Sequence, residues 1–196
     1  ATNLNAVDAT YIQATISETT AANLAAISVD NSTRASLNKF SVVVSDTSAT
    51  AAELNAVSAI TSVAADFSNV TGIEASPSSA ITTLYTASTT GLGNETISVN
   101  DTTLNAATLN TINGYTTGNV TITATSLEGN ADDVLTAVTN TGTGVVAAGL
   151  EIPVTISDTG AIDAGTLGSI VDIVDGYGDD DVVTVSSNAT TLTGTQ

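Results

Sequence analysis

Two kinds of short segment alternate along the chain. The first kind is rich in Val, Ile and Thr with partial alternation, which is typical of strands. The second kind carries small and apolar residues at helical spacing. Strand segments are predicted at 40–46, 96–100, 120–126, 152–158 and 181–187, and helical segments at 48–58, 76–86 and 130–139. Alternating strands and helices predict parallel strands joined by crossovers.

The helical segments begin with recognisable start signals. Thr50 and Glu53 have the spacing of a capping box. Ser76 is predicted to cap the second helix, with Pro77 at its first position, and Asn130 to cap the third. Each helix is too short to be stable alone in water, so packing against strands must stabilise it.

One phrase recurs along the chain: "ISETTAANLAAI" at 16–27, "VSDTSATAAELNAV" at 44–57, "VNDTTLNAATLNTI" at 99–112 and "ISDTGAIDAGTLGSI" at 156–170. Its acidic turn residue lies at Glu18, Asp46, Asp101 and Asp158, and we predict a turn and helix-cap role for Asp46 rather than a catalytic one. A second pattern, at 70–88 and 123–141, lies in the two longer intervals between copies of this phrase.

The helical leucines indicate the period of the repeat, which is about 29 residues. These leucines are Leu24, Leu54, Leu84, Leu109, Leu135 and Leu167. We therefore predict an α/β solenoid whose coils of 25–32 residues contain a parallel strand and a short Ala-rich helix, in two alternating coil types. The alternative is an all-β fold, a β-helix or a β-sandwich, because Thr, Ser, Asn and Gly are abundant.

The predicted organisation is a single repeat array over 1–196. Its approximate units are 1–41 (partial), 42–96, 97–154 and 155–196, the last with an insertion near 175–183. The chain begins without Met, and residues 4–7 repeat residues 54–57, which suggests a processed product or an excerpt of a longer repeat protein.

Composition limits the chemistry of the chain. Aromatic residues are 3% of the 196 residues against 42% hydrophobic, so the core must consist of Ala, Val, Ile and Leu. There is no His or Cys, which excludes Ser-His-Asp and Cys-His catalysis and zinc sites built from imidazole or thiolate. Asp132 and Asp133 suit the positive end of a helix better than a catalytic pair. We expect no enzyme.

Charge and hydropathy restrict the partners. Twenty acidic residues face two basic ones, a net charge of −18, which opposes binding to nucleic acid. No run of ~18 apolar residues is present, so membrane insertion is not expected. Six Asn-x-Ser/Thr sequons make attached glycans possible. They lie at Asn31, Asn69, Asn94, Asn100, Asn119 and Asn188.

The insertion "DGYGDDDVV" at 175–183 is similar to a calcium-binding nonapeptide at Gly176, Gly178, Asp180 and Val182, with Asp175 in place of its first glycine. Asp175, Asp179, Asp180 and Asp181 are its candidate calcium ligands. Calcium needs six to eight oxygen ligands, and a single nonapeptide supplies only part of such a shell. The alternative is a Gly-Asp surface loop without a metal.

The segment 97–141 resembles the tandem repeats of giant exported cyanobacterial surface proteins, of the β-strand-repeat or S-layer-like kind. The matching positions are Leu109-Asn110-Thr111-Ile112, Gly114, Thr116-Thr117-Gly118, Val120, Leu127, Gly129 and Ala131-Asp132-Asp133-Val134. The likeness is good over 42–96 and weaker at both ends. It implies an extracellular or cell-surface structural role, in some cases with calcium-binding nonapeptides, and carries over no catalytic residue.

We therefore expect an acidic extracellular structural protein, a subunit or segment of a surface layer, sheath or filament that associates with further copies or further repeats. The alternative is an adhesin or carbohydrate-binding surface module, with glycans as its partners.

Overall fold

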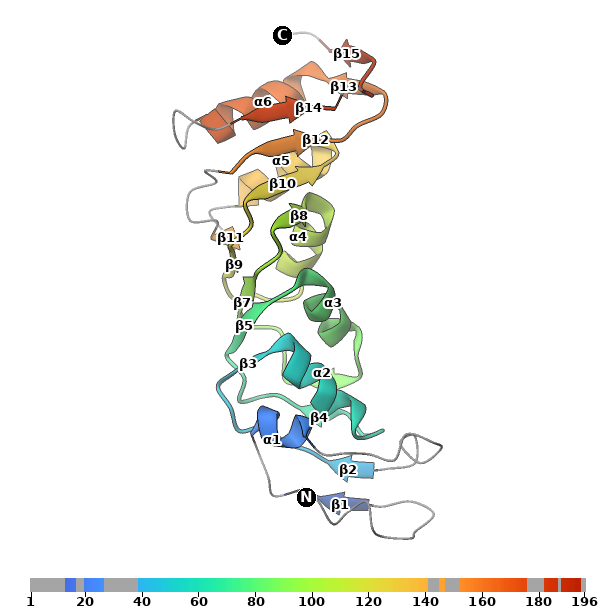
Figure 1. Ribbon diagram of the computed structural model, residues 1–196, viewed down its shortest axis with the longest axis vertical. Helices are drawn as coiled ribbons and strands as arrows, with labels where there is room; N and C mark the ends of the chain where they lie inside the picture. Colours follow the sequence, from blue (N-terminus) through green and yellow to red (C-terminus); the bar gives the residue numbers. More distant parts are fainter. Residues whose placement is uncertain are drawn as a thin grey trace. The chain divides into compact units, whose positions relative to one another are not determined.

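The computed structural model describes residues 13–16, 20–26, 39–140, 145–146, 152–175, 182–186 and 188–194. In these residues the chain forms six helices and fifteen strands (Figure 1), and the strands pair in parallel. The mixed α/β class predicted from the sequence is confirmed. The all-β alternative is wrong for this part of the chain because helices follow the strands throughout it.

The helices are short and the strands shorter. The helices are α1 (Ala21–Ala25), α2 (Ala51–Ala59), α3 (Ser78–Thr86), α4 (Ala106–Asn113), α5 (Ala131–Thr139) and α6 (Ala164–Asp175). The strands are β1 (Gln13–Thr15), β2 (Lys39–Ser41), β3 (Ser48–Thr50), β4 (Ala65–Asp66), β5 (Gly72–Ser76), β6 (Thr89–Thr90), β7 (Thr96–Val99), β8 (Thr103–Asn105), β9 (Val120–Ile122), β10 (Ser126–Gly129), β11 (Val145–Val146), β12 (Val154–Ile156), β13 (Ala161–Asp163), β14 (Val183–Val185) and β15 (Thr191–Thr193).

The chain divides into two compact units, 1–97 and 98–196. In the first, β1 pairs with β2, β3 with β5 and β4 with β6, and α2 packs between α1 and α3. In the second, β8, β10, β12 and β14 follow one another in a parallel sheet, β9 pairs with β11, β13 pairs with β15, and α5 packs between α4 and α6. The single array over 1–196 stays a prediction.

A short strand leads into each helix from α2 to α6, and the sequence did not predict it. Residues 48–50 and Ser76 were expected to be the starts of helices, yet they belong to β3 and β5, which pair with each other. The helices accordingly begin at Ala51 and Ser78. Local sequence cannot reveal this change because the strands are formed by pairing with residues about one repeat away.

Two of the three predicted helix caps are confirmed. Thr50 and Glu53 form the capping box, and the Asn130 side chain accepts a hydrogen bond from the Asp133 N–H. The third is wrong, because the N-cap of α3 is Pro77 and no side chain caps the helix from that position. Ser76 is buried at the end of β5 and serves another purpose, described below.

The buried helical row differs from the row of predicted leucines. The apolar residue on the fourth position of each helix is Leu24, Leu54, Ile81, Leu109, Val134 or Leu167. Leu84 is also buried, but at the seventh position, where α2 has Val57 and α4 has Ile112. Leu135 is only half-buried, and Val134 beside it faces the core. Counting leucines alone therefore placed α3 and α5 in the wrong register.

Small residues allow each helix to start close to the neighbouring strand. Ala51 and Ala106, the first residues of α2 and α4, are fully buried. Opposite Ala106 lies Gly129 of β10, and a Cβ atom at Gly129 would be 2.9 Å from the Ala106 Cβ. The helix and the strand approach closely at this contact because both residues are small.

No helix in the described residues is long and apolar enough to cross a membrane.

We predict that Gly129→Ala destabilises the protein by roughly 1–3 kcal/mol, because the added methyl group has no space beside Ala106. Gly168→Ala is the matched control. Gly168 lies inside α6, nothing would lie within 4 Å of its added Cβ, and Ala should stabilise the helix by about 0.5–1 kcal/mol. Chemical denaturation followed by circular dichroism measures both. Equal effects of the two substitutions would contradict the close contact.

Candidate interaction surface

The starts of the helices are bonded to the next repeat. The first N–H groups of a helix have no acceptor within the helix itself. The Ala51 N–H of α2 donates to Ser76 Oγ at 2.9 Å, 25 residues along the chain. The Ala131 N–H of α5 donates to Asp158 Oδ2 at 2.8 Å, 27 residues along. Ala21 N–H of α1 donates to Asp46 Oδ2, again 25 residues along.

The helices also carry caps from their own repeats. Thr50 Oγ1, Asn105 Oδ1 and Asn130 Oδ1 each accept the N–H of the residue three positions later. Asp163 Oδ1 does the same for the Thr166 N–H at 2.9 Å. The starts of α2 and α5 thus combine a local cap with a partner from the following repeat, and the second partner makes each start depend on its neighbour.

The partner alternates between an aspartate and a small residue. Aspartates face the starts of α1 and α5. Small residues face the starts of the helices that follow an aspartate turn: Ser76 faces α2, Gly129 faces α4 and Gly194 faces α6. Asp46 is thus a helix-cap residue, as predicted, but it caps α1 rather than the helix that follows it.

Asparagines connect neighbouring helices at equivalent positions. Asn55 Nδ2 of α2 donates to the Ala80 carbonyl of α3, and Asn110 Nδ2 of α4 donates to the Asp133 carbonyl of α5, both at 2.9 Å. Each Oδ1 atom is buried without a hydrogen-bond partner among the described residues. These amides fix the register of one helix on the next.

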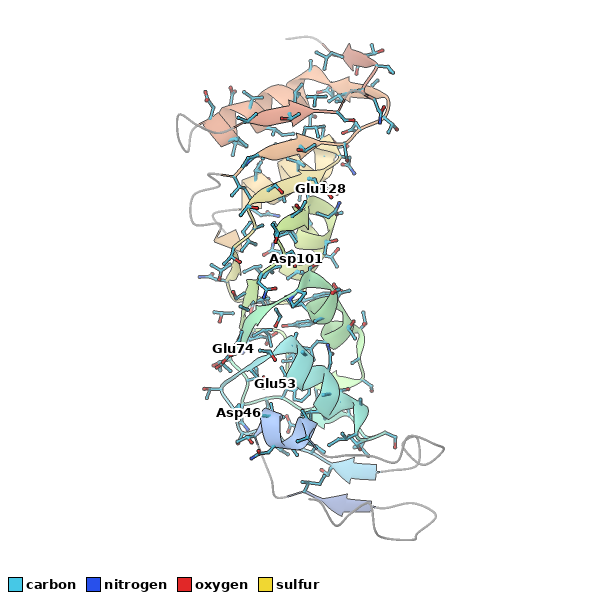
Figure 2. The ribbon with its side chains drawn as sticks, in the orientation of Figure 1. Asp46, Glu53, Glu74, Asp101 and Glu128 are labelled. Atoms are coloured by element: carbon cyan, nitrogen blue, oxygen red, sulfur yellow. The ribbon has the colours of Figure 1, made fainter. Side chains whose placement is uncertain are left out.

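A small pocket of about 170 Å³ in the first unit contains acidic residues. Its walls include Asp46, Glu53 and Glu74, which Figure 2 labels near the starts of α1 and α2. Asp46 and Glu53 accept backbone N–H groups at helix starts, and Glu74 Oε1 accepts the Ser48 hydroxyl at 2.7 Å. Within the described ranges no three such side chains are arranged to hold a metal ion. The carboxylates here act as caps.

Glu95 is a buried carboxylate that the sequence analysis missed. It is 0% exposed, and it accepts the Gly93 and Asn94 N–H groups at 2.8 and 3.0 Å as well as the Tyr85 hydroxyl. These donors hold the turn before β7 against α3. The sequence signal for this turn is the pair of glycines at 91 and 93, and both have positive φ in the structure.

Asp66 lies in the turn that faces this glycine turn. The Ser68 N–H donates to Asp66 Oδ1 at 2.9 Å, and this bond, with a weaker side-chain bond from the same serine, lowers the pKa of Asp66. The folded chain therefore binds this proton less tightly than the unfolded chain, and the resulting stabilisation is present at neutral pH and lost as pH falls through the lowered pKa. A Cβ atom at Gly91 would be 2.4 Å from the Ser68 nitrogen, so the two turns are in close contact.

The four predicted calcium ligands are only partly placed. Asp175 is the exposed last residue of α6, which at 12 residues is longer than α2 to α5. Asp179, Asp180 and Asp181 lie outside the described residues. The choice between a calcium loop and a plain surface loop stays a prediction.

The last strands of the second unit expose apolar side chains. Val183 of β14 lies in register with Val154, Val185 with Ile156, and Leu192 of β15 with Ile162. A pocket of about 400 Å³ opens beside them, and its lining includes Ile162, Leu167, Val185 and Leu192. An exposed apolar surface of this kind is typical of an interaction site rather than a solvated edge.

Comparisons of the chain with protein-family models, with curated proteins and with solved structures give no match. Function is therefore inferred from the chain itself.

We predict that Ser76→Ala destabilises the first unit by about 1–3 kcal/mol, because it leaves the buried Ala51 N–H without its acceptor. The matched control is Ser79→Ala on the exposed surface of α3, which should change stability by less than about 0.5 kcal/mol. Denaturant unfolding of both variants is the measurement. A loss at Ser76 no larger than at Ser79 would show that the cross-repeat bond does not contribute.

The segment 175–183 is either a calcium-binding loop or a surface loop without a metal. Thermal unfolding of the protein in calcium and in EDTA distinguishes the two. A calcium site raises Tm in calcium by mass action, and Asp180→Asn should abolish that rise. If Tm is the same in both solutions, the 175–183 segment is a surface loop without a metal.

Proposed function

We propose that the chain is a structural repeat protein of the cell exterior, a segment of a surface layer, sheath or filament. In this proposal its repeats form an α/β solenoid with two alternating coil types, and the molecule works by length and repetition rather than by catalysis. One observation carries the proposal: the starts of helices obtain hydrogen-bond partners from the next repeat, at 25 to 27 residues along the chain.

Other bonds with similar offsets support a stacked arrangement. Within the first unit the Thr71 N–H and hydroxyl both bond to the Thr47 carbonyl, and within the second unit Thr125 does the same to Thr102. The offset is 24 residues in the first case and 23 in the second. Each repeat contacts its neighbour through the same atoms, which is how solenoids build length.

The alternation of helix partners supports two coil types. Aspartate-turn repeats present Asp46 or Asp158 to the previous helix, while the others present Ser76 or Gly129. The asparagine bonds follow the same alternation. Asn55 and Asn110 both lie in helices that follow an aspartate turn, and each donates a hydrogen bond to a helix of the other coil type. A pair of repeats is then the unit that elongates the protein.

An extracellular location is supported by the resemblance of 97–141 to exported surface repeats. A dense acidic surface keeps such a polymer soluble and repels nucleic acid.

An adhesin remains the second candidate because the sheet of the second unit carries a polar row. Asn105, Glu128, Thr155 and Thr184 lie in register on successive strands. Regularly spaced amide, carboxylate and hydroxyl groups can bind a repeating glycan. Binding on a glycan array that Glu128→Ala abolishes would favour this function.

We expect the purified chain to form long polymers or ordered lattices as its concentration rises. Negative-stain electron microscopy and sedimentation velocity measure this directly. Monodisperse monomers at every concentration and ionic strength would contradict the structural role.

A further inference from the structure

We propose that the buried amides of Asn55 and Asn110 exclude slipped packings of neighbouring helices, and that they lower the stability of the native packing in doing so. Each amide acts within one unit of the chain. The inference therefore concerns how each unit selects a single folded arrangement, and it goes beyond the proposed function without depending on it.

The two amides occupy equivalent places in the two units. Asn55 is the fifth residue of α2, and its Nδ2 donates at 2.9 Å to the carbonyl of Ala80, the third residue of α3. Asn110 is the fifth residue of α4, and its Nδ2 donates at 2.9 Å to the carbonyl of Asp133, the third residue of α5. In each case the two helices pack side by side (Figure 1). The same contact thus occurs twice, in separate parts of the chain.

Each amide also leaves one atom unsatisfied. The Oδ1 atoms of Asn55 and Asn110 are buried and accept no hydrogen bond from the residues that the structure describes. Burying such an acceptor costs free energy comparable with the net gain from the Nδ2 bond. A leucine of similar size would bury no unsatisfied atom, and the carbonyls of Ala80 and Asp133 would keep the helical N–H four residues later as their donor. Stability alone therefore does not explain the amides.

The rest of the contact surface does little to determine how one helix lies along the next. Outside their core-facing residues, α2 carries only Ala, Glu, Asn and Ser, and α4 carries only Ala, Thr and Asn. Small side chains form low ridges, so they provide few large projections that fit only one groove of the neighbouring helix. A repetitive chain also has many similar packings to avoid. Some specific polar contact is needed to select one of them.

A slipped packing would lose the Nδ2 bond. If α5 moved along α4 by one residue, the next carbonyl would point about 100° away around the helix, and Nδ2 would have no acceptor. Both polar atoms of the Asn110 amide would then be buried without partners. An unpaired buried donor disfavours the slipped packing by roughly 5- to 150-fold relative to the native one. A buried asparagine selects the register of coiled-coil helices in the same way.

The amide occurs once in each pair of helices. The fifth residue of α3 is Thr82, whose hydroxyl donates to the Ser78 carbonyl of its own helix. The fifth residue of α5 is Leu135, which is apolar. Register is therefore fixed from α2 to α3 and from α4 to α5, each time by the helix that follows an aspartate turn.

The test compares Asn110→Leu with Asn113→Leu in the full chain. Asn113 is the last residue of the same helix and is half-buried, as Asn110 is. Thermal unfolding measures stability, and two-dimensional nuclear magnetic resonance counts the backbone amide signals of α4 and α5. We expect Asn110→Leu to keep Tm at or above the wild-type value, because it removes a buried unsatisfied atom, and to give more than one signal for residues of these helices. Asn113→Leu should give single signals.

A role limited to hydrogen bonding predicts a different result. Asn110→Leu would then lower Tm below that of Asn113→Leu and keep one signal for each residue. Single signals at any Tm would overturn the exclusion of slipped packings, and a lower Tm would overturn the cost in stability. Asn55→Leu, with the signals of α2 and α3, repeats the test in the first unit. Both measurements are made on monomers at low concentration, so failure of the chain to polymerise would contradict the proposed function and leave this inference standing.

Discussion

A backbone N–H at the start of a helix has no acceptor within its own helix, and this chain supplies one from the following repeat. Ala51 obtains Ser76, Ala131 obtains Asp158 and Ala21 obtains Asp46. A buried N–H without a partner costs about 1–3 kcal/mol. Helices of five to twelve residues are marginal alone. The starts of these three helices therefore depend on the presence of the following repeat.

The composition follows from the same dependence. Helices that approach strands closely need small residues at their starts, so Ala and Gly take the places where larger side chains would collide. The expected core of Ala, Val, Ile and Leu is wrong at one position, because Phe67 is fully buried. The polar side chains that remain, Thr, Asn and Asp, bond repeat to repeat: Thr71 to Thr47, Asn55 to Ala80, Asp158 to Ala131. The high threonine content therefore has a structural cause.

The sequence predicted features that depend on neighbouring residues and missed those that depend on residues one repeat away. The capping box at Thr50 and the cap at Asn130 need only four consecutive positions, and both are present. Ser76 was assigned to its own helix, although its partner Ala51 lies 25 residues earlier. The strands β3 and β5 were missed for the same reason, since pairing creates them. Leu192 is exposed, although Ile162, its partner in register, is buried. The repetition in the sequence does not show this difference, because it depends on how the strands pair.

The central claim is that the starts of α1, α2 and α5 are held by the following repeat, and amide hydrogen exchange tests it most directly. Nuclear magnetic resonance can follow the Ala51 and Ala131 amides, which are first in their helices and bonded to Ser76 and Asp158. The account predicts slow exchange at both, comparable with the amides inside the helices, and fast exchange of Ala51 in Ser76→Ala. Fast exchange of both amides in the wild type, as at an ordinary frayed helix end, would contradict it.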